Sequence, residues 1–219
     1  MGGRTTVGVV RVGATVRRPR TPNSAFVERL LAALEQAGFD RAPRYLGVDD
    51  SGRDILEFIE GFVPPELDAG YPDSVLAAAA TLIRRFHDAT AASSLAGGAE
   101  VVCHGDLSPC NFVFRGGEPF AIIDFDSASR GARLADLGYA LFPGSNLGTD
   151  GPGVAEQARR IRVFCDAYDV ETDARVIDAT VAAVSRTTGR LRGKGQSGAD
   201  WWQTQLEWLE RQRERLLER

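Results

Sequence analysis

Three polar side chains near the middle of the chain have the types needed to hold a metal ion and to accept a proton. Asp106 and Asn111 lie on one loop, and Asp124 follows two short apolar runs further along the chain. Phosphoryl transfer to a hydroxyl needs a carboxylate near the acceptor proton, together with hard oxygen ligands for Mg²⁺. One carboxylate, one amide and a second carboxylate supply these groups. They can act together only if the fold brings them to one place.

The elements around these residues are predicted to bring them together. Residues 101–103, 111–114 and 121–123 are short apolar segments typical of strands. The last two would form a hairpin that folds Asp124 back over Asn111. A simpler interpretation is that the Asp, Asn, Gly and Pro residues of this segment only form turns. Turn formation alone does not account for their order.

A zinc site is another interpretation of the same segment. Cys103, His104 and Cys110 lie close together in the sequence. Structural zinc usually takes four ligands, and the chain has no C-x-x-C pair. His87 is the only other histidine, and it borders the apolar face of a predicted helix, where a structural role is expected. The sequence therefore favours phosphoryl transfer over zinc binding.

The order of these residues resembles a known family. His-Gly-Asp at 104–106 is followed by Leu-Ser-Pro-Cys-Asn at 107–111, and then by Ile-Asp-Phe-Asp at 123–126. This pattern resembles the aminoglycoside phosphotransferase and choline kinase family, and also the catalytic loop of protein kinases. The resemblance implies an α+β, protein-kinase-like fold with two lobes. The small β-rich N-terminal lobe would comprise residues 1–61, and the helical C-terminal lobe residues 62–219.

The resemblance also implies roles for individual residues. Asp106 would be the catalytic base or would orient the acceptor hydroxyl. Asn111 and Asp124 would bind Mg²⁺, and the co-substrate would be ATP or GTP. Three further residues would support the site: His104, Asp126 and Asp136. Asp126 could contact a second metal ion or cap the loop, His104 would brace the loop, and Asp136 would anchor the helix that follows.

The N-terminal part reads as two strands, a helix and two more strands. The strands are expected at 7–10, 15–18, 45–48 and 54–59, with a turn at 12–14 and a helix from Thr21-Pro22 to Gly38. Gly61, Pro64 and Pro65 then mark the lobe boundary. The adenine would lie near the backbone of the last strand, at Glu57, Phe58, Ile59 and Glu60.

The expected phosphate-binding features of this lobe are incomplete. The family usually has a glycine-rich turn between two strands, whereas here only Gly2 and Gly3 precede the first strand, so the turn is expected to be incomplete or the chain to start late. Lys194, the only lysine, is too late in the chain to be the lysine that grips the phosphates. Arg17 or Arg18 could replace it, with Glu28 as the first candidate for its carboxylate partner and Glu35 as the second. Neighbours on a strand point to opposite faces, so only one of the two arginines can face the nucleotide.

Helices are expected in the C-terminal part at 75–90, 154–168, 172–187 and 200–217. The net charge of −4 gives no basic footprint for nucleic acid, and no apolar run is long enough to span a membrane. The three cysteines do not suggest a disulfide framework, which favours the cytoplasm. Acidic and basic residues nearly balance from 154 to 219, so a strongly acidic aminoglycoside pocket is not evident. A neutral or anionic metabolite or antibiotic is equally compatible as acceptor.

The sequence therefore predicts a kinase that phosphorylates a hydroxyl of a small molecule with ATP or GTP. One alternative is a kinase-fold binding or immunity protein that has lost turnover, which the missing lysine favours. A protein kinase is a further alternative. Ser108 argues against it, because protein-serine kinases usually have lysine at that position of the catalytic loop.

Overall fold

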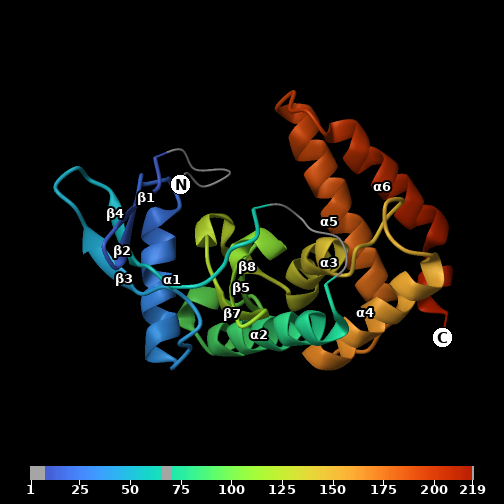
Figure 1. The fold of residues 1–219 in the computed structure, drawn as a ribbon, viewed down its shortest axis with the longest axis horizontal. Helices are drawn as coiled ribbons and strands as arrows, with labels where there is room; N and C mark the ends of the chain where they lie inside the picture. Colours follow the sequence, from blue (N-terminus) through green and yellow to red (C-terminus); the bar gives the residue numbers. More distant parts are fainter. Residues whose placement is uncertain (1–7, 66–70, 219) are drawn as a thin grey trace.

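The computed structural model describes residues 8–65 and 71–218, and an antiparallel sheet forms its N-terminal end (Figure 1). The sheet consists of β1 (Val10–Val12), β2 (Thr15–Arg18), β3 (Tyr45–Val48) and β4 (Asp54–Glu57), in the order β1-β2-β4-β3. β2 and β4 are the central strands, and Arg18 pairs with Asp54 in their ladder. Arg18 therefore lies on a central strand, at the end of the β2–β4 ladder.

The first strand lies later in the chain than predicted. β1 pairs with β2 through Val10–Arg17 and Val12–Thr15, with the turn at Gly13 and Ala14. Gly13 adopts a φ of 62°, which glycine tolerates without strain. The tight turn sets the register, so the strand begins at Val10. Val7, Gly2 and Gly3 lie outside the described residues.

Helix α1 (Ser24–Gln36) packs one apolar face on the rest of the fold through Leu30, Leu31 and Leu34. It begins later than predicted, because Thr21 and Ser24 bond each other in a turn that precedes the helix. Asn23, just before the helix, donates its side-chain amide to the carbonyl oxygens of Asp126 and Ala128, at 2.9 and 3.0 Å. The start of α1 is thereby fixed to the loop that follows Asp124.

The remainder is mostly helical. Its helices are α2 (Asp73–Ala91), α3 (Arg133–Gly144), α4 (Val154–Tyr168), α5 (Ala174–Gly193) and α6 (Ala199–Gln212). Two small strand pairs lie among them: β5 (Val101–Cys103) with β8 (Ser129–Gly131), and β6 (Phe112–Arg115) with β7 (Glu118–Ile122). Four single turns of 3₁₀ helix complete the secondary structure: η1 (Ser94–Ala96), η2 (Pro109–Asn111), η3 (Phe125–Ser127) and η4 (Arg215–Leu217).

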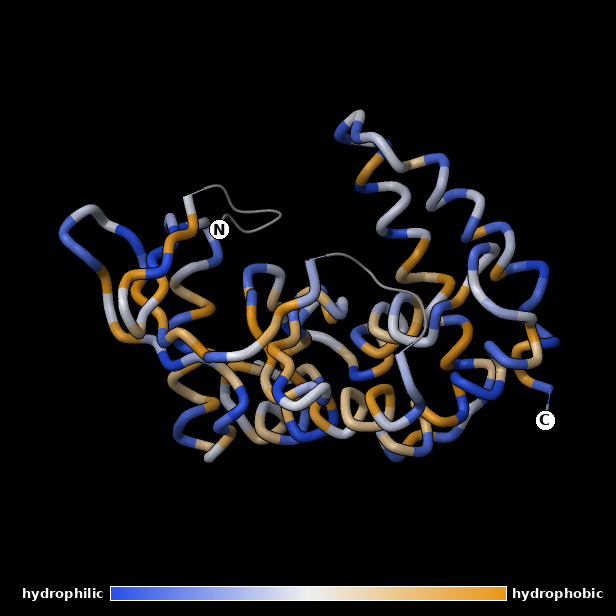
Figure 2. The backbone as a smooth tube through the Cα atoms, viewed as in Figure 1, coloured by the Kyte–Doolittle hydropathy of each residue, from blue (hydrophilic) through white to orange (hydrophobic). Residues whose placement is uncertain are grey.

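The hydrophobic residues gather where the helices meet the strand pairs, and the loop tips are hydrophilic (Figure 2). α5 packs on α3 and on α6. The helices α5 and α6 project together as an arm (Figure 1). Among residues 8–65 and 71–218, no helix is both long and apolar enough to cross a membrane. The architecture is an α+β fold with a small sheet at one end and helices over the rest.

The chain passes from the sheet to the helical part at Gly61. Phe62 and Phe114 exchange two backbone hydrogen bonds, of 2.9 and 2.7 Å, which attach the crossing to the β6–β7 hairpin. A Cβ atom on Gly61 would overlap Val113 Cγ1 and would lie 2.6 Å from the Phe114 carbonyl oxygen. Gly61 also has a φ of 151°. Only glycine fits at this close approach of two backbones.

We therefore expect Gly61→Ala to lower the free energy of unfolding by about 1–3 kcal/mol, the range for overpacking a tight site. Gly52→Ala is the matched control. Gly52 also has a positive φ, of 73°, but nothing lies within 4 Å of the position that an alanine methyl group would take there. Denaturant unfolding of the two variants makes the comparison. Equal losses would mean that backbone strain alone, and not the contact with the hairpin, requires glycine at position 61.

Candidate active site

The loop from His104 to Asn111 begins with a sharp turn against the segment after Asp124. Gly105 has a φ of 80°, and a Cβ atom there would lie 2.5 Å from the carbonyl oxygen of Ser127. The absence of a side chain at position 105 lets the loop and η3 lie against each other. The loop continues from this turn through Asp106 to η2.

His104 braces the loop through both nitrogens of its ring. Its ring is fully buried, and Nδ1 accepts a hydrogen bond of 3.2 Å from the backbone N–H of Asp106. Nε2 must then carry the ring proton, which it donates to the carbonyl of Ile123 at 3.0 Å. One side chain therefore connects the backbone at Asp106 with the residue that precedes Asp124.

Asn111 completes this connection from the other end of the loop. Its side-chain nitrogen donates to the carbonyl of Asp106 at 2.7 Å, and its own carbonyl accepts from the N–H of Ile123 at 2.9 Å. The amide nitrogen is engaged, so its oxygen Oδ1 is the atom left for a ligand. Asp106, Asn111 and Asp124 are thus held by one hydrogen-bonded backbone unit.

Asp124 has a left-handed backbone conformation, and the next residue, Phe125, is buried. The φ and ψ of Asp124 are 65° and 61°, and about a third of its side chain is exposed. Phe125 is buried, with its ring centroid 4.7 Å from that of His104 and 5.7 Å from that of Phe86. A left-handed conformation at a non-glycine residue costs free energy, so it persists where the surroundings enforce it. The packing of Phe125 is the anchor that turns the Asp124 carboxylate outward.

Asp136 holds the start of the loop through hydrogen bonds to its backbone. It accepts hydrogen bonds from the N–H groups of His104 and Gly105, at 2.7 and 2.8 Å, and from Nε2 of His87 at 3.0 Å. Complete burial alone would raise the pKa of Asp136, but the hydrogen bond and charge of His87, followed by His104 and Gly105, hold that pKa below its ordinary value. His87 Nδ1 shares a hydrogen bond of 2.7 Å with the Tyr168 hydroxyl. This buried chain gives His87 the structural role expected of it.

The two candidate arginines on β2 point to opposite sides. Arg18 is buried and makes ion pairs with Asp124, at 3.9 Å, and with Asp126. Arg17 lies 3.7 Å from Asp49 on the other side, where it also contacts Thr15. Arg18 is therefore the one of the two that faces Asp124 and Asp126.

The expected pairing of Glu28 with one of these arginines is wrong. Glu28 lies 3.9 Å from Arg20, which also binds Asp54 at 2.6 Å. The physical reason is the late start of α1, which leaves Arg20 in the preceding loop within reach of Glu28. Asp124 and Asp126 provide the negative charge that Arg18 needs.

The sequence of this chain matches a known protein family over most of its length. A model of the APH family, described as the phosphotransferase enzyme family, matches residues 13–176, which is most of the chain. The chain belongs to this family. A relative from Rhizobium leguminosarum bv. trifolii, named trifolitoxin immunity protein, is 33% identical over 198 residues, with 80% of this chain and 74% of the relative covered.

Solved structures of APH-type and choline-kinase-type proteins have the same fold. A macrolide 2′-phosphotransferase from Brachybacterium faecium matches with a TM-score of 0.63 at 15% identity, over 88% of this chain and 84% of that one. A choline/ethanolamine kinase family protein from Mesorhizobium loti matches with a TM-score of 0.61 at 20% identity, over 100% and 87%. An APH(2″)-IIa structure with streptomycin and ATP has a TM-score of 0.58 at 14% identity, over 95% and 91%. The predicted kinase-like, two-lobed α+β fold is confirmed.

Tyr139 is a site residue of this APH-family chain to which the sequence motif assigned no role. It lies on α3, one turn after Asp136, and its hydroxyl donates a hydrogen bond to the Asp106 carboxylate. Burial first, and then the charge and hydrogen bond of Asp106, raise the pKa of Tyr139. The phenol therefore stays protonated and remains a donor to Asp106. The spacing of Asp136 and Tyr139 on one helix face was the available signal.

The residues expected to contact adenine form the crossing between β4 and the helical part. Glu57 ends β4 and pairs with Arg44, and Phe58 donates its N–H to the Ala14 carbonyl at 2.9 Å. The N–H groups of Ile59 and Glu60 donate to no other residue in the described part of the chain. These backbone donors are available for a ligand along this edge.

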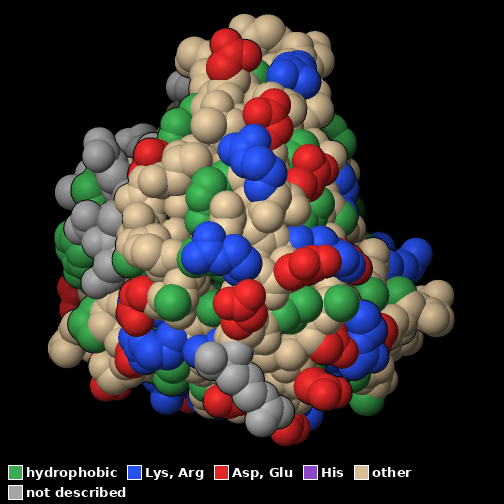
Figure 3. Space-filling model, turned by 90° about the vertical axis from the view of Figure 1, so that its right-hand side faces the viewer, with side chains coloured by type: hydrophobic (Ala, Val, Ile, Leu, Met, Phe, Trp, Pro, Cys, Tyr) green, Lys and Arg blue, Asp and Glu red, His purple; other side chains and the backbone are tan. Residues whose placement is uncertain are grey.

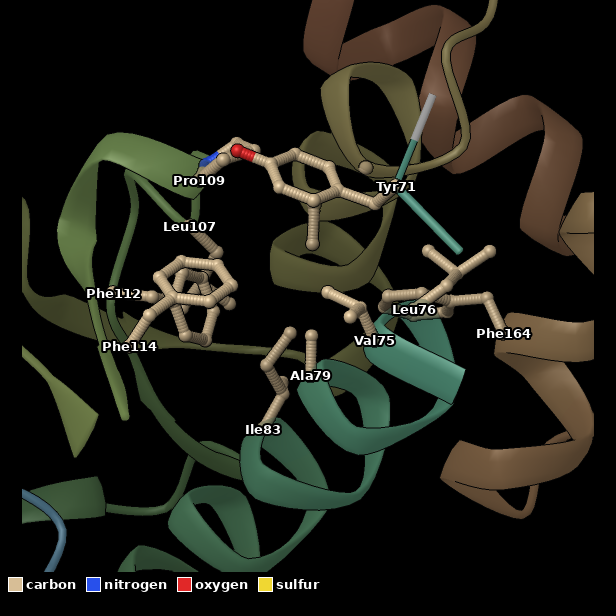
Figure 4. A pocket seen from close by; sticks show the side chains of 12 residues that line it. Tyr71, Val75, Leu76, Ala79, Ile83, Leu107, Pro109, Phe112, Phe114 and Phe164 are labelled. Carbon is tan, nitrogen blue, oxygen red and sulfur yellow. The ribbon is translucent and has the colours of Figure 1, made fainter. Parts of the chain in front are cut away.

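An apolar pocket lies behind the catalytic loop (Figure 4). Leu107 and Pro109 line one side of it, and Val75, Leu76 and Ala79 of α2 line the opposite side. Tyr71 reaches over the pocket, and its ring stacks on Phe114 at a centroid distance of 5.8 Å. The pocket is only about 30 Å³ in volume, so it is packing space that seats the loop on α2 and no binding site for an organic molecule.

The three cysteines form no disulfide with one another. Cys103 and Cys165 are buried, and Cys110 is partly exposed. Burial first, and then the charge of Asp136, raise the pKa of the Cys103 thiol to about 12, so it stays protonated. Among residues 8–65 and 71–218, no three His, Cys, Asp or Glu side chains are grouped so as to hold a metal ion. This absence does not bear on the magnesium site predicted at Asn111 and Asp124, because that site needs only two protein ligands and one of them is an asparagine.

Proposed function

We propose that this protein transfers the γ-phosphoryl group of ATP or GTP to a hydroxyl of a small molecule, with Asp106 as the catalytic base. The observation that carries the proposal is the network of His104, Asn111 and Ile123, which fixes the backbone on both sides of Asp106 and next to Asp124. Preorganised groups need little rearrangement when the substrates bind.

Asp106 is placed to orient the acceptor hydroxyl and to take its proton. Its backbone N–H and C=O are both engaged within the loop, so the carboxylate is the part of the residue free to act. A carboxylate has two oxygens, so it can accept from the Tyr139 hydroxyl and still accept from the hydroxyl of a substrate. A base positioned in this way contributes about 10²- to 10⁴-fold to the rate.

The donors at Asn111 and Asp124 fit Mg²⁺. An amide oxygen and a carboxylate oxygen are hard ligands, and Mg²⁺ usually takes one or two of these from protein and the rest from phosphates and water. The bound ion would neutralise charge on the phosphates of the nucleotide. Asp126 faces the same side through its contact with Arg18 and would support the site without being required as a ligand.

The nucleotide would lie between the sheet and the catalytic loop. Its base would meet the unused N–H groups of Ile59 and Glu60, and its phosphates would meet Arg18. Nε of Arg18 is buried and has no hydrogen-bond acceptor within the described residues, so it can donate to a phosphate oxygen. A guanidinium can bind phosphate oxygens in a forked arrangement, which replaces the lysine of related kinases.

Arg18→Ala is expected to weaken nucleotide binding by about 1–3 kcal/mol, the range for a charged hydrogen bond. Arg17→Ala is the matched control and should leave the affinity nearly unchanged, because Arg17 points to Asp49. Arg18→Lys should restore part of the affinity by keeping the charge. Titration calorimetry with ATP and Mg²⁺ measures all three variants, and equal affinity for wild type and Arg18→Ala would exclude Arg18 as the phosphate-binding residue.

The proposed reaction is tested with a γ-labelled nucleotide and a panel of hydroxylated small molecules. We expect label to pass to at least one acceptor in the presence of Mg²⁺ and to remain on the nucleotide without it. ATP and GTP are compared in parallel. A protein that binds the nucleotide and labels no acceptor in a broad panel would contradict the proposal.

A second candidate function is protection of the cell by binding alone. The similarity to a protein named trifolitoxin immunity protein favours it, and so does the lack of a lysine on β2. The two candidates differ in their dependence on Asp106. If cells expressing this chain resist trifolitoxin, Asp106→Asn would preserve resistance that rests on binding and abolish resistance that rests on phosphorylation.

A further inference from the structure

A cavity of about 300 Å³ opens beside the catalytic loop, between α5 and the β5–β8 pair. Gly105, the neighbour of Asp106, lines it from the loop, and Tyr139 lines it from α3. Because the Tyr139 hydroxyl bonds the Asp106 carboxylate, the cavity lies next to the group that would meet the acceptor hydroxyl. A molecule in this cavity could therefore present a hydroxyl to Asp106.

Close packing of α3 and α5 brings one wall of the cavity to this place. Gly138 lies against the backbone of α5, where a Cβ atom would come 2.7 Å from the N–H nitrogen of Thr180 and would overlap the Ala179 carbonyl. The missing side chain lets the two helices approach. Arg186 and Arg190, one turn apart on α5, then line the cavity. Ala183 and Thr187 of the same helix also line it.

The cavity wall carries excess positive charge. Arg130, Arg186 and Arg190 line it, and Asp136 is the only carboxylate among the described residues that line it. The Asp136 oxygens are already bonded to His87 and to the loop backbone, and Arg130 donates from Nε to the Leu95 carbonyl at 2.8 Å. Arg186 and Arg190 also line the cavity, and no carboxylate of the described residues pairs with either of them.

These two arginines differ from other arginines of the helical part. Arg159 and Arg213, for example, each bind a carboxylate with two nitrogens at 2.9 Å or less. Arg186 and Arg190 make no ion pair or hydrogen bond with any residue in the described ranges. Like charges one turn apart on a helix repel each other, so this pair is most stable when an anion lies between them. The guanidinium group also has the geometry to bind a carboxylate or phosphate with two hydrogen bonds.

The outer face of α4, α5 and α6 shows no comparable accumulation. Acidic and basic side chains alternate over that face (Figure 3). This face therefore carries no basic patch.

We propose that the acceptor is a small hydroxylated molecule with a carboxylate or phosphate group, which Arg186 and Arg190 bind while the hydroxyl lies at Asp106. This inference rests on the proposed phosphotransferase function. It assigns the acceptor to an anionic class, whereas a polycationic aminoglycoside would be repelled by the same arginines. Gly105, the neighbour of Asp106, lines the same cavity of about 300 Å³ as Arg186 and Arg190, so one small molecule can reach both ends of it.

The test uses the full chain saturated with ADP and Mg²⁺, so that anionic probes cannot occupy the nucleotide site. Glycerate and glycerol 3-phosphate are titrated as the carboxylate and phosphate arms, with glycerol as the neutral probe and streptomycin as the polycationic one. We expect one or both anionic probes to bind and the other two to bind at least 10-fold more weakly. Arg186→Gln with Arg190→Gln should lower the anionic affinity by about 10- to 100-fold, as for loss of charged hydrogen bonds.

Arg192→Gln is the matched control, since Arg192 lies on the same helix and does not line the cavity. It should leave the anionic affinity unchanged. The inference is overturned if neither anionic probe binds, if streptomycin binds more tightly than both, or if the double variant binds them like wild type. Nucleotide titration of the same proteins is read separately. Absent nucleotide binding would contradict the proposed function, and the anionic probes would then be titrated without ADP, where a loss of affinity in the double variant still reports binding at α5.

Discussion

Asp106→Asn is expected to reduce turnover by about 10²- to 10⁴-fold, the contribution of a positioned general base. The substitution removes the negative charge and preserves the shape of the side chain. Since the backbone of Asp106 holds the loop through His104 and Asn111, the loop should keep its conformation. Nucleotide affinity should therefore change little. Steady-state kinetics with any labelled acceptor and an ATP titration measure the two effects.

Asp50→Asn is the control for this experiment, because Asp50 is exposed in the loop between β3 and β4, far along the chain from the catalytic loop. It should leave both turnover and nucleotide affinity unchanged. An Asp106→Asn protein with near wild-type turnover would remove Asp106 from the mechanism. Loss of nucleotide binding with Asp106→Asn would instead assign this carboxylate to the metal and nucleotide site.

The largest expected effect on stability comes from Asp136. Asp136→Asn should lower the free energy of unfolding by about 3–5 kcal/mol, the range for breaking a buried charged pair. The carboxylate accepts from His87, His104 and Gly105, whereas an amide offers one acceptor oxygen and turns an N–H group toward these donors. Denaturant unfolding at neutral pH measures the loss.

The same residue predicts a pH dependence. Because the folded-state pKa of Asp136 is lowered from its ordinary value of 3.8, its stabilising contribution is present above about that pH and is lost as the pH falls through the folded pKa. The difference between wild type and Asp136→Asn should therefore shrink below about pH 4. Asp88→Asn is the control, since Asp88 is half exposed and its ion pairs should contribute less than about 1 kcal/mol. A constant difference from pH 7 to pH 3 would contradict this assignment.

The conformation of the loop from His104 to Asn111 could be predicted from the chain order because its hydrogen bonds are local. Asp106 and Asn111 are five residues apart and bond each other, and the β6–β7 hairpin returns Ile123 to Asn111. Turn chemistry and short apolar strands are enough to predict such an arrangement. The helix of residues 154–168 was also predicted at its observed bounds, because its apolar period is regular.

The remaining site residues depend on contacts that the sequence does not contain. Tyr139 reaches Asp106 across more than thirty positions, and α5 reaches the loop only because Gly138 lets the two helices approach. The pairing of Glu28 was predicted wrongly for a similar reason, since a turn at Thr21 delayed the start of α1 and left Arg20 nearer. Tertiary packing selects such partners, and helical or strand periodicity does not.

Nucleotide titration with and without Mg²⁺, on wild type and Asp124→Asn, tests the central claim most directly. Asp124 is outward-facing beside the loop, so its loss should remove metal-dependent binding with little effect on folding. We predict that ATP or GTP raises the unfolding free energy of wild type by about 2.7 kcal/mol at 100 times the Kd when Mg²⁺ is present. We predict that Asp124→Asn loses most of this Mg²⁺-dependent increase. If wild type shows no Mg²⁺-dependent nucleotide binding, or if Asp124→Asn retains all of it, the site does not work as a phosphotransferase centre.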